Sequence, residues 1–177
     1  MLDALFDDRA DDGAEDGTED LAARLSLNGP VVALLPGTRR YAHTSLQLMM
    51  TALAAWPAAT GLVAWVPDNV PEISGWTYRP CTCTNTATEP GLVGVFARGE
   101  QRVYLLRHRF VAVLRAANLV LGTAGTAHEQ AAALGRPVVA FPLAPSYRAD
   151  VFRNQKRLFR AALGAVEARP GSRWRHT

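Results

Sequence analysis

Residues 118–142 have the pattern of a strand, a turn of small residues and a helix, an arrangement that can bind an anion. Residues 118–121 form an apolar run too short for a helix, which predicts a buried strand. A turn of small residues follows, and it lets a ligand approach the backbone closely; it consists of Gly122, Thr123, Ala124 and Gly125. A helix is predicted over residues 126–134, beginning with Thr126 and Ala127 and ended by Gly135 and Pro137. Its unpaired N–H groups and its dipole would point at an anion held by the turn.

Two side chains of the predicted helix lie close to this turn. Glu129, one turn inside the helix, can accept hydrogen bonds from sugar hydroxyls of a ligand whose phosphates lie on the turn. The simpler alternatives are a favourable charge near a helix N-terminus and a solvated side chain. His128 is interpreted as a surface residue or as one that supports the site from behind. A glycine turn between a strand and a helix is also ordinary α/β architecture, so a ligand site and plain structure both stay open.

A second candidate site follows the apolar run of residues 31–35. The loop after this predicted strand holds Gly37, Thr38, Arg39 and Arg40. A glycine, a hydroxyl group and two guanidinium groups between a strand and a helix suit a diphosphate. The alternative is an ordinary loop with exposed arginines.

Strands and helices are predicted to alternate through the chain. Strands are predicted at residues 31–35, 61–66, 91–98, 102–106, 118–121 and 136–141, and helices at 43–56, 107–117, 126–134 and 151–163. Residues 70–90 contain three helix breakers and predict a short helix with an irregular excursion. Within residues 43–56, one face is expected in the core, and it consists of Leu46, Met49, Met50, Leu53 and Trp56.

This alternation predicts an α/β domain with a doubly wound parallel sheet and helices on both faces. Such a sheet binds ligands at the carboxyl ends of its strands. Those ends carry residues 37–40, 106–109, 122–129 and 142–150, which are expected to converge on one rim. The domain is expected over residues 29–164, after an acidic tail at 1–28 without stable structure and before an irregular tail at 165–177.

Charge is distributed unevenly along the 177 residues. The first twenty residues hold nine carboxylates and one arginine, whereas the whole chain has a net charge of +3, so the rest is basic. A basic domain indicates an anionic partner, either phosphates or an acidic membrane surface, and no nucleic acid is expected. Arginine accounts for eighteen of the nineteen basic residues, a bias that a GC-rich genome would also produce.

The sequence predicts neither a metal site nor a membrane span. Cys81 and Cys83 are the only cysteines, and two thiols one residue apart cannot supply four zinc ligands. No apolar run reaches the roughly twenty residues of a transmembrane helix, and the acidic N-terminus is unlike a secretory signal. A cytoplasmic protein, alternatively one at the membrane periphery, is expected. Neither a G-x-G-x-x-G turn nor a G-x-x-x-x-G-K-[ST] loop occurs, which argues against dehydrogenases and P-loop enzymes.

Three motifs resemble the nucleotide-sugar-binding half of GT-B glycosyltransferases, most closely the lipid-A-disaccharide synthase and synthase-related family. They are LLPGTR at residues 34–39, GTAGTAHEQAAALGRPVV at 122–139 and F-x-x-Q-x-R-L at 152–158. The resemblance covers residues 31–163 and implies a Rossmann-like domain that forms one half of a GT-B fold.

The resemblance also implies roles for single residues. The turn from Gly122 through Ala127 would hold the diphosphate of a UDP-sugar, and Glu129 would bind the ribose hydroxyls. Main-chain groups near Leu106 and Arg107 would contact uracil, and the segment Gly37, Thr38 and Arg39 would close over the phosphates. The donor sugar would contact Gln155 and the loop 142–150, which contains Arg148. No residue is assigned to catalysis, and no metal or cofactor is implied.

The chain departs from the family in ways that leave the function open. No acceptor domain precedes residue 31, and residues 43–45 stand where relatives often carry acidic side chains. The expectation is a donor-binding half that does not catalyse alone and whose acceptor side comes from a partner chain or from a homo-oligomer. Whether such a chain is an enzyme is left open. The alternatives are a non-catalytic nucleotide or phosphosugar-binding module and one half of a nucleotide-sugar epimerase.

Overall fold

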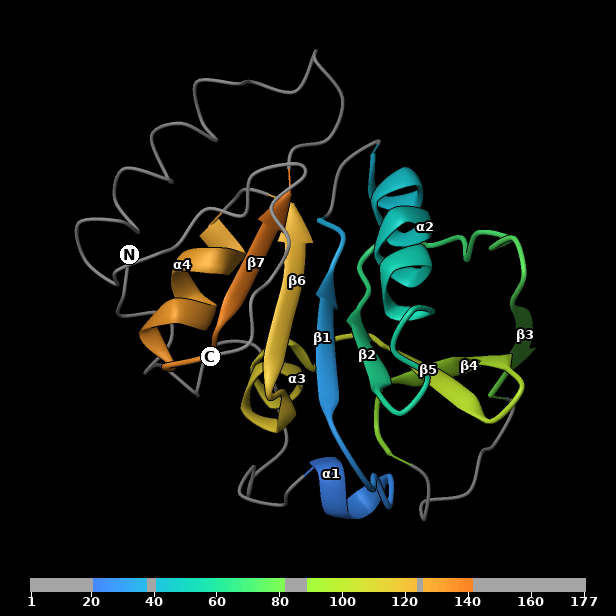
Figure 1. Cartoon of the computed structure of the whole chain (residues 1–177), viewed down its shortest axis with the longest axis horizontal. Coiled ribbons are helices and arrows are strands. Elements are labelled where there is room, and N and C mark those ends of the chain that lie inside the picture. The colour runs from blue at the N-terminus through green and yellow to red at the C-terminus, as the bar shows by residue number, and fades with distance from the viewer. Residues whose placement is uncertain (1–20, 38–40, 82–88, 124–125, 142–177) are drawn as a thin grey trace, which may run out of the picture.

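The computed structural model describes residues 21–37, 41–81, 89–123 and 126–141, with a seven-stranded sheet at its centre (Figure 1). The helices are α1 (Leu21–Arg24), α2 (Ala42–Leu53), α3 (Phe110–Ala116) and α4 (Thr126–Ala133). The strands are β1 (Val31–Leu35), β2 (Thr60–Ala64), β3 (Thr77–Pro80), β4 (Leu92–Arg98), β5 (Gln101–Leu106), β6 (Leu119–Thr123) and β7 (Val138–Phe141). Their order across the sheet is β3-β4-β5-β2-β1-β6-β7.

Five strands, β5-β2-β1-β6-β7, run parallel, as the alternation of strands and helices predicted. All five residues of β1 are buried, because the strand lies between β2 and β6 and is covered on both faces. An uninterrupted apolar run is what such a strand requires. The α/β class is therefore confirmed, with a mostly parallel sheet flanked by helices.

The prediction of a wholly parallel sheet is wrong at one edge. β4 pairs with β5 and with β3 in antiparallel orientation. The turn between β4 and β5 is only Gly99 and Glu100, and a parallel connection needs a crossover of a dozen or more residues. Gly99 adopts a φ of 56°, which suits a tight hairpin. β3 occupies part of the segment where a short helix was expected.

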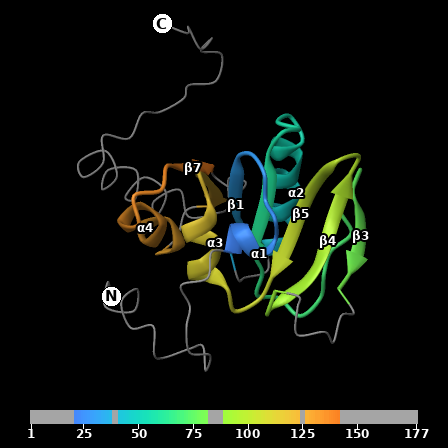
Figure 2. The ribbon, with the colours of Figure 1, turned by 90° about the horizontal axis from the view of Figure 1, so that it is seen from below.

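Helices cover both faces of the sheet (Figure 2). On one face α2 packs on a cluster that includes Leu34, Val63 and Phe96. On the other face α1, α3 and α4 pack on a second cluster that includes Val31, Leu62 and Val120. β1 contributes alternate side chains to the two clusters, since successive residues of a strand point to opposite faces.

The end of α2 differs from its prediction. The helix ends at Leu53, and Trp56, expected in the core, is 42% exposed. Gln101, the buried first residue of β5, holds this end of the helix. Its side-chain amide lies within hydrogen-bonding distance of three carbonyl oxygens, those of Leu53 (3.1 Å), Trp56 (2.9 Å) and Ala59 (3.0 Å). Leu53 ends α2 and the other two residues lie in the segment that leads to β2, so this amide fastens both the helix end and that segment to β5.

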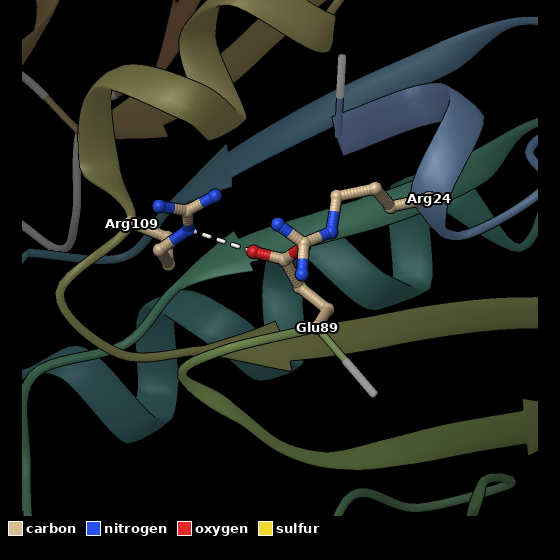
Figure 3. Close-up of polar contacts among 3 residues, drawn as sticks. All are labelled: Arg24, Glu89 and Arg109. Carbon is tan, nitrogen blue, oxygen red and sulfur yellow. Dashed lines mark ion pairs between the residues drawn. The ribbon is translucent and has the colours of Figure 1, made fainter. Parts of the chain in front are cut away.

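The acidic tail predicted through residue 28 ends earlier, because α1 is docked on the domain. Leu21 is 2% exposed within the second cluster. The buried carboxylate of Glu89 lies between Arg24 of α1, at 2.9 Å, and Arg109 at the start of α3, at 2.7 Å (Figure 3). The two carboxylate oxygens make no hydrogen bond of good geometry, so the attraction is that of ion pairs. We refer to these three residues as the Glu89 triad.

Candidate functional site

The strand order places a switch in direction at the carboxyl ends of β1 and β6, and we refer to this edge of the sheet as the crevice. From β1 the chain passes through α2 to β2 on one side, whereas β6 and then β7 lie on the other side. The connections that leave β1 and β6 therefore diverge, and the carboxyl ends of these two strands mark a topological switch point. Open α/β sheets bind ligands at such a point.

Gly37 and Thr123 lie next to one another at this edge of the sheet. Gly37 follows β1 with a φ of 83°, in the region that favours glycine. A Cβ atom built on Gly37 would lie 4.0 Å from Oγ1 of Thr123, the last residue of β6. Gly37 is exposed. Gly37 and Thr123, which belong to two separately predicted sites, are thus adjacent in space.

Gly122 allows α4 to pack directly on β6. A Cβ atom on Gly122 would overlap Nε2 of His128, so the imidazole fills the space that a side chain would occupy. His128 is fully buried, and the interpretation of it as a surface residue is wrong. The sequence pattern of α4 indicated this burial only weakly. Among the residues of α4 only His128 and Ala131 are buried, and the helix is rich in alanine throughout.

The imidazole of His128 is held in its neutral form. Burial away from water lowers the pKa of His128 from 6.5 to about 4. Among the residues that the structure describes, neither ring nitrogen has a hydrogen-bond partner, which leaves the charged form without compensation. His128 therefore acts as a packing residue that sets the distance between α4 and β6, and α4 begins directly after the turn.

Gly122→Ala is expected to lower the free energy of unfolding by about 1–3 kcal/mol, because the methyl group overpacks the site of His128. Urea denaturation would measure the change. In a His128→Ala background the space is free, so the same methyl group should cost less. An equal cost in both backgrounds would contradict the packing role.

The first turn of α4 presents Thr126 and Glu129 to solvent, whereas Ala127 packs partly against the second cluster. Glu129 makes a contact within the protein and is exposed. A carboxylate at this position stabilises the helix through the dipole and weakens the attraction of the helix N-terminus for a bare anion. A role for Glu129 in binding a ligand therefore requires hydroxyl groups on that ligand.

The end of β5 is farther from the crevice, because β2 and β1 lie between β5 and β6. The carbonyl oxygen of Leu106 accepts from the N–H of Trp65 at 2.8 Å, and the N–H of Arg107 donates to Gly91 at 2.8 Å. The Arg107 guanidinium donates to the carbonyl oxygens of Pro67 (2.6 Å) and Asp68 (2.7 Å). These groups fasten the neighbouring loops to β5. At about 4.8 Å per strand, β5 and β6 lie roughly 14 Å apart, so a ligand that contacted both would have to cross the whole rim.

His43 and Trp65 occupy the rim between these two ends. His43, in the first turn of α2, stacks on Trp65, which follows β2, with ring centroids 5.5 Å apart and an angle of 14° between the planes. Trp65 is 1% exposed and His43 is partly exposed. Neither residue was predicted to belong to the site. The available signal was a tryptophan near the end of the strand predicted at residues 61–66.

The remaining predicted site residues lie outside the described part of the chain. They are Thr38, Arg39, Ala124, Gly125, Arg148 and Gln155. Their roles stay predictions.

Two further expectations concern the described residues alone. Across residues 21–37, 41–81, 89–123 and 126–141, no group of three or more histidine, cysteine or acidic side chains is placed to hold a metal ion. Over the same ranges, none of the helices combines the length and apolarity that crossing a membrane requires.

In comparisons with known proteins, no family model, no curated protein and no solved structure matched the chain. The function is therefore argued from the geometry of the crevice and from the motifs that form it.

Proposed function

We propose that this chain is the donor-binding half of a glycosyltransferase of the lipid-A-disaccharide synthase-related type, and that it holds a UDP-sugar at the crevice between β1 and β6. The observation that supports this most strongly is the meeting of Gly37 and Thr123 at the topological switch point. They belong to two of the three motifs on which the resemblance rests, Gly37 to LLPGTR and Thr123 to the motif that begins GTAGTAHEQ.

The chemistry of the crevice suits a diphosphate better than an apolar ligand. Gly37 is exposed and has no side chain, so its backbone is accessible. On the opposite side, α4 begins within three residues of Thr123 and directs its N-terminal N–H groups and its dipole toward the same edge of the sheet. A diphosphate would accept hydrogen bonds from both loops. In this proposal the acceptor and the catalytic base belong to a partner domain.

The direct test is calorimetric titration of the full chain with UDP, a UDP-sugar and inorganic phosphate. Saturable binding of UDP, tighter than that of phosphate, is expected. No saturable binding of UDP, or equal affinity for UDP and phosphate, would overturn the proposal. Release of UDP on addition of a separately expressed acceptor domain would distinguish a transferase from a module that only binds.

Glu129→Ala is expected to weaken binding of UDP by about 1–3 kcal/mol, which is 5- to 150-fold, because ribose hydroxyls would lose their acceptor. Affinity for inorganic phosphate should stay the same or rise slightly, since a negative charge leaves the first turn of α4. Glu100→Ala, at an exposed hairpin position, is the matched control and should change neither affinity. Unchanged affinity for UDP in Glu129→Ala would refute the ribose contact.

A further inference from the structure

A pocket separate from the crevice lies on the other side of α2. It has a volume of about 650 Å³ and is bounded by α2, by the segment between β2 and β3, and by β3 and β4. Figure 1 shows this segment beside α2, on the side away from β6. The pocket shares no residue with the crevice. Its volume falls in the range of small-molecule sites, roughly 300–1,000 Å³.

The floor of the pocket is aromatic. Tyr78 and Phe96 form a tilted pair with centroids 4.9 Å apart, and Trp76 lines the same space. Phe96 is fully buried, whereas Trp76 and Tyr78 are partly exposed. Tyr78 lies against Gly94, where any side chain would overlap its ring, and its hydroxyl donates to the carbonyl oxygen of Val93 at 3.2 Å. The rings are therefore held in place before any ligand arrives.

The wall of the pocket supplies polar groups of both kinds. The side-chain oxygen of Gln47 accepts the N–H of Ser74 at 3.1 Å, which ties the loop to α2 and leaves the amide N–H groups of Gln47 as donors. Glu72 provides an exposed carboxylate, an acceptor. The hydroxyl group of Ser74 can either donate or accept a hydrogen bond.

In the described part of the chain, no residue that lines the pocket is an arginine, lysine or histidine, although the chain has eighteen arginines. A phosphate or a carboxylate would meet Glu72 with no cation to compensate, so an anionic ligand is disfavoured. An ammonium group could pair with Glu72 and the rings but has no acceptor for the amide of Gln47. A hydroxyl group both donates and accepts, and a sugar ring has an apolar face that packs on an aromatic ring.

We propose that this pocket binds a neutral saccharide ring, with Trp76 against the apolar face of the sugar and with Glu72 and Gln47 bonded to its hydroxyl groups. The proposal does not depend on nucleotide binding at the crevice, because the two sites share no residues and call for ligands of different charge, a neutral one here and an anionic one at the crevice.

The test is titration of the full chain with glucose, N-acetylglucosamine and maltose, followed by saturation-transfer NMR, with choline as the cationic probe and inorganic phosphate as the anionic one. Saturable binding of at least one sugar is expected, and UDP should not displace it. Glu72→Ala should weaken that binding at least fivefold, and the exposed Glu100→Ala should leave it unchanged. Trp76→Ala should abolish it, whereas Trp56→Ala, at another exposed tryptophan, should not.

Each remaining outcome would overturn the proposal. Choline binding without sugar binding would make the pocket a cation site. If none of the sugars gives saturable binding at about 20 mM, well above a Kd of about 1 mM, the pocket does not bind saccharides and the proposal is wrong. Glu72 is exposed, so Glu72→Ala tests the site even if Trp76→Ala proves unstable. Equal loss of binding in Glu72→Ala and Glu100→Ala would show that the sugar binds elsewhere.

Discussion

Glu89→Gln is expected to lower the free energy of unfolding by about 3 kcal/mol, measured by urea denaturation at neutral pH. The glutamine keeps the size of the side chain but removes the charge that lies between two guanidinium groups. Breaking a buried ion pair by removing one partner costs roughly 3–5 kcal/mol. The side chains of Arg24 and Arg109 are 30% and 19% exposed and can turn partly to water. The expected loss of unfolding free energy therefore lies at the lower end of this range.

The same substitution at the surface provides the control for the Glu89 triad. Glu100→Gln lies in the exposed turn between β4 and β5 and should stay within about 0.5 kcal/mol of the parent. Arg24→Gln should cost less than Glu89→Gln, because Glu89 would keep Arg109. It should also speed hydrogen exchange in α1, whose attachment includes this ion pair. Equal stability of Glu89→Gln and Glu100→Gln would show that the triad contributes nothing.

Acid is expected to destabilise the protein through His128 by about 3 kcal/mol between pH 6.5 and pH 4. The folded protein binds this proton only near pH 4, whereas the unfolded chain binds it near the ordinary value of 6.5. The contribution of His128 to the free energy of unfolding is therefore fully present above pH 6.5. It is lost as the pH falls toward 4, because over this range mainly the unfolded state gains the proton. At about 1.4 kcal/mol per pKa unit, the difference between the two pKa values gives the stated loss.

The contribution of His128 is isolated by comparing the parent with His128→Leu at each pH. The leucine fills a similar volume and does not titrate, so the difference in unfolding free energy between the two proteins should change by about 3 kcal/mol from pH 7 to pH 4. His108→Asn removes an exposed imidazole at a residue with φ of 56°, a conformation that asparagine tolerates, and should keep the full acid-dependent loss. Parallel pH profiles of the parent and His128→Leu would contradict the burial argument.

Much of the architecture could be predicted because its signals are local. Five consecutive apolar residues fixed the position of β1, and the spacing of Leu46, Met49 and Met50 identified the buried face of α2. The proximity of Gly37 and Thr123 agrees with the expected convergence of strand ends, since β1 and β6 are neighbours that end at the same edge of the sheet. Each of these features could be predicted from one short segment or from the rule that neighbouring parallel strands end at the same edge of a sheet.

The features that were missed depend on contacts between different elements of the fold. β3 has mostly exposed side chains and ends in Pro80, and it is a strand only because β4 pairs with it. α1 has four residues, too few for a readable period, and its docking depends on Glu89. The burial of His128 depends on the absence of a side chain at Gly122. None of these relationships leaves a periodic pattern in the sequence.

The central place of β1 has a consequence for how the protein is made. The N–H of Val31 donates to the side-chain oxygen of Asn118, a partner 87 positions later in the chain, and β6 flanks the strand over its length. A ribosome adding about 5–20 residues per second needs roughly 4–17 s to reach that partner. Until then this wholly apolar strand lacks β6 as its neighbour, so we expect the growing polypeptide to bind chaperones that recognise extended hydrophobic segments.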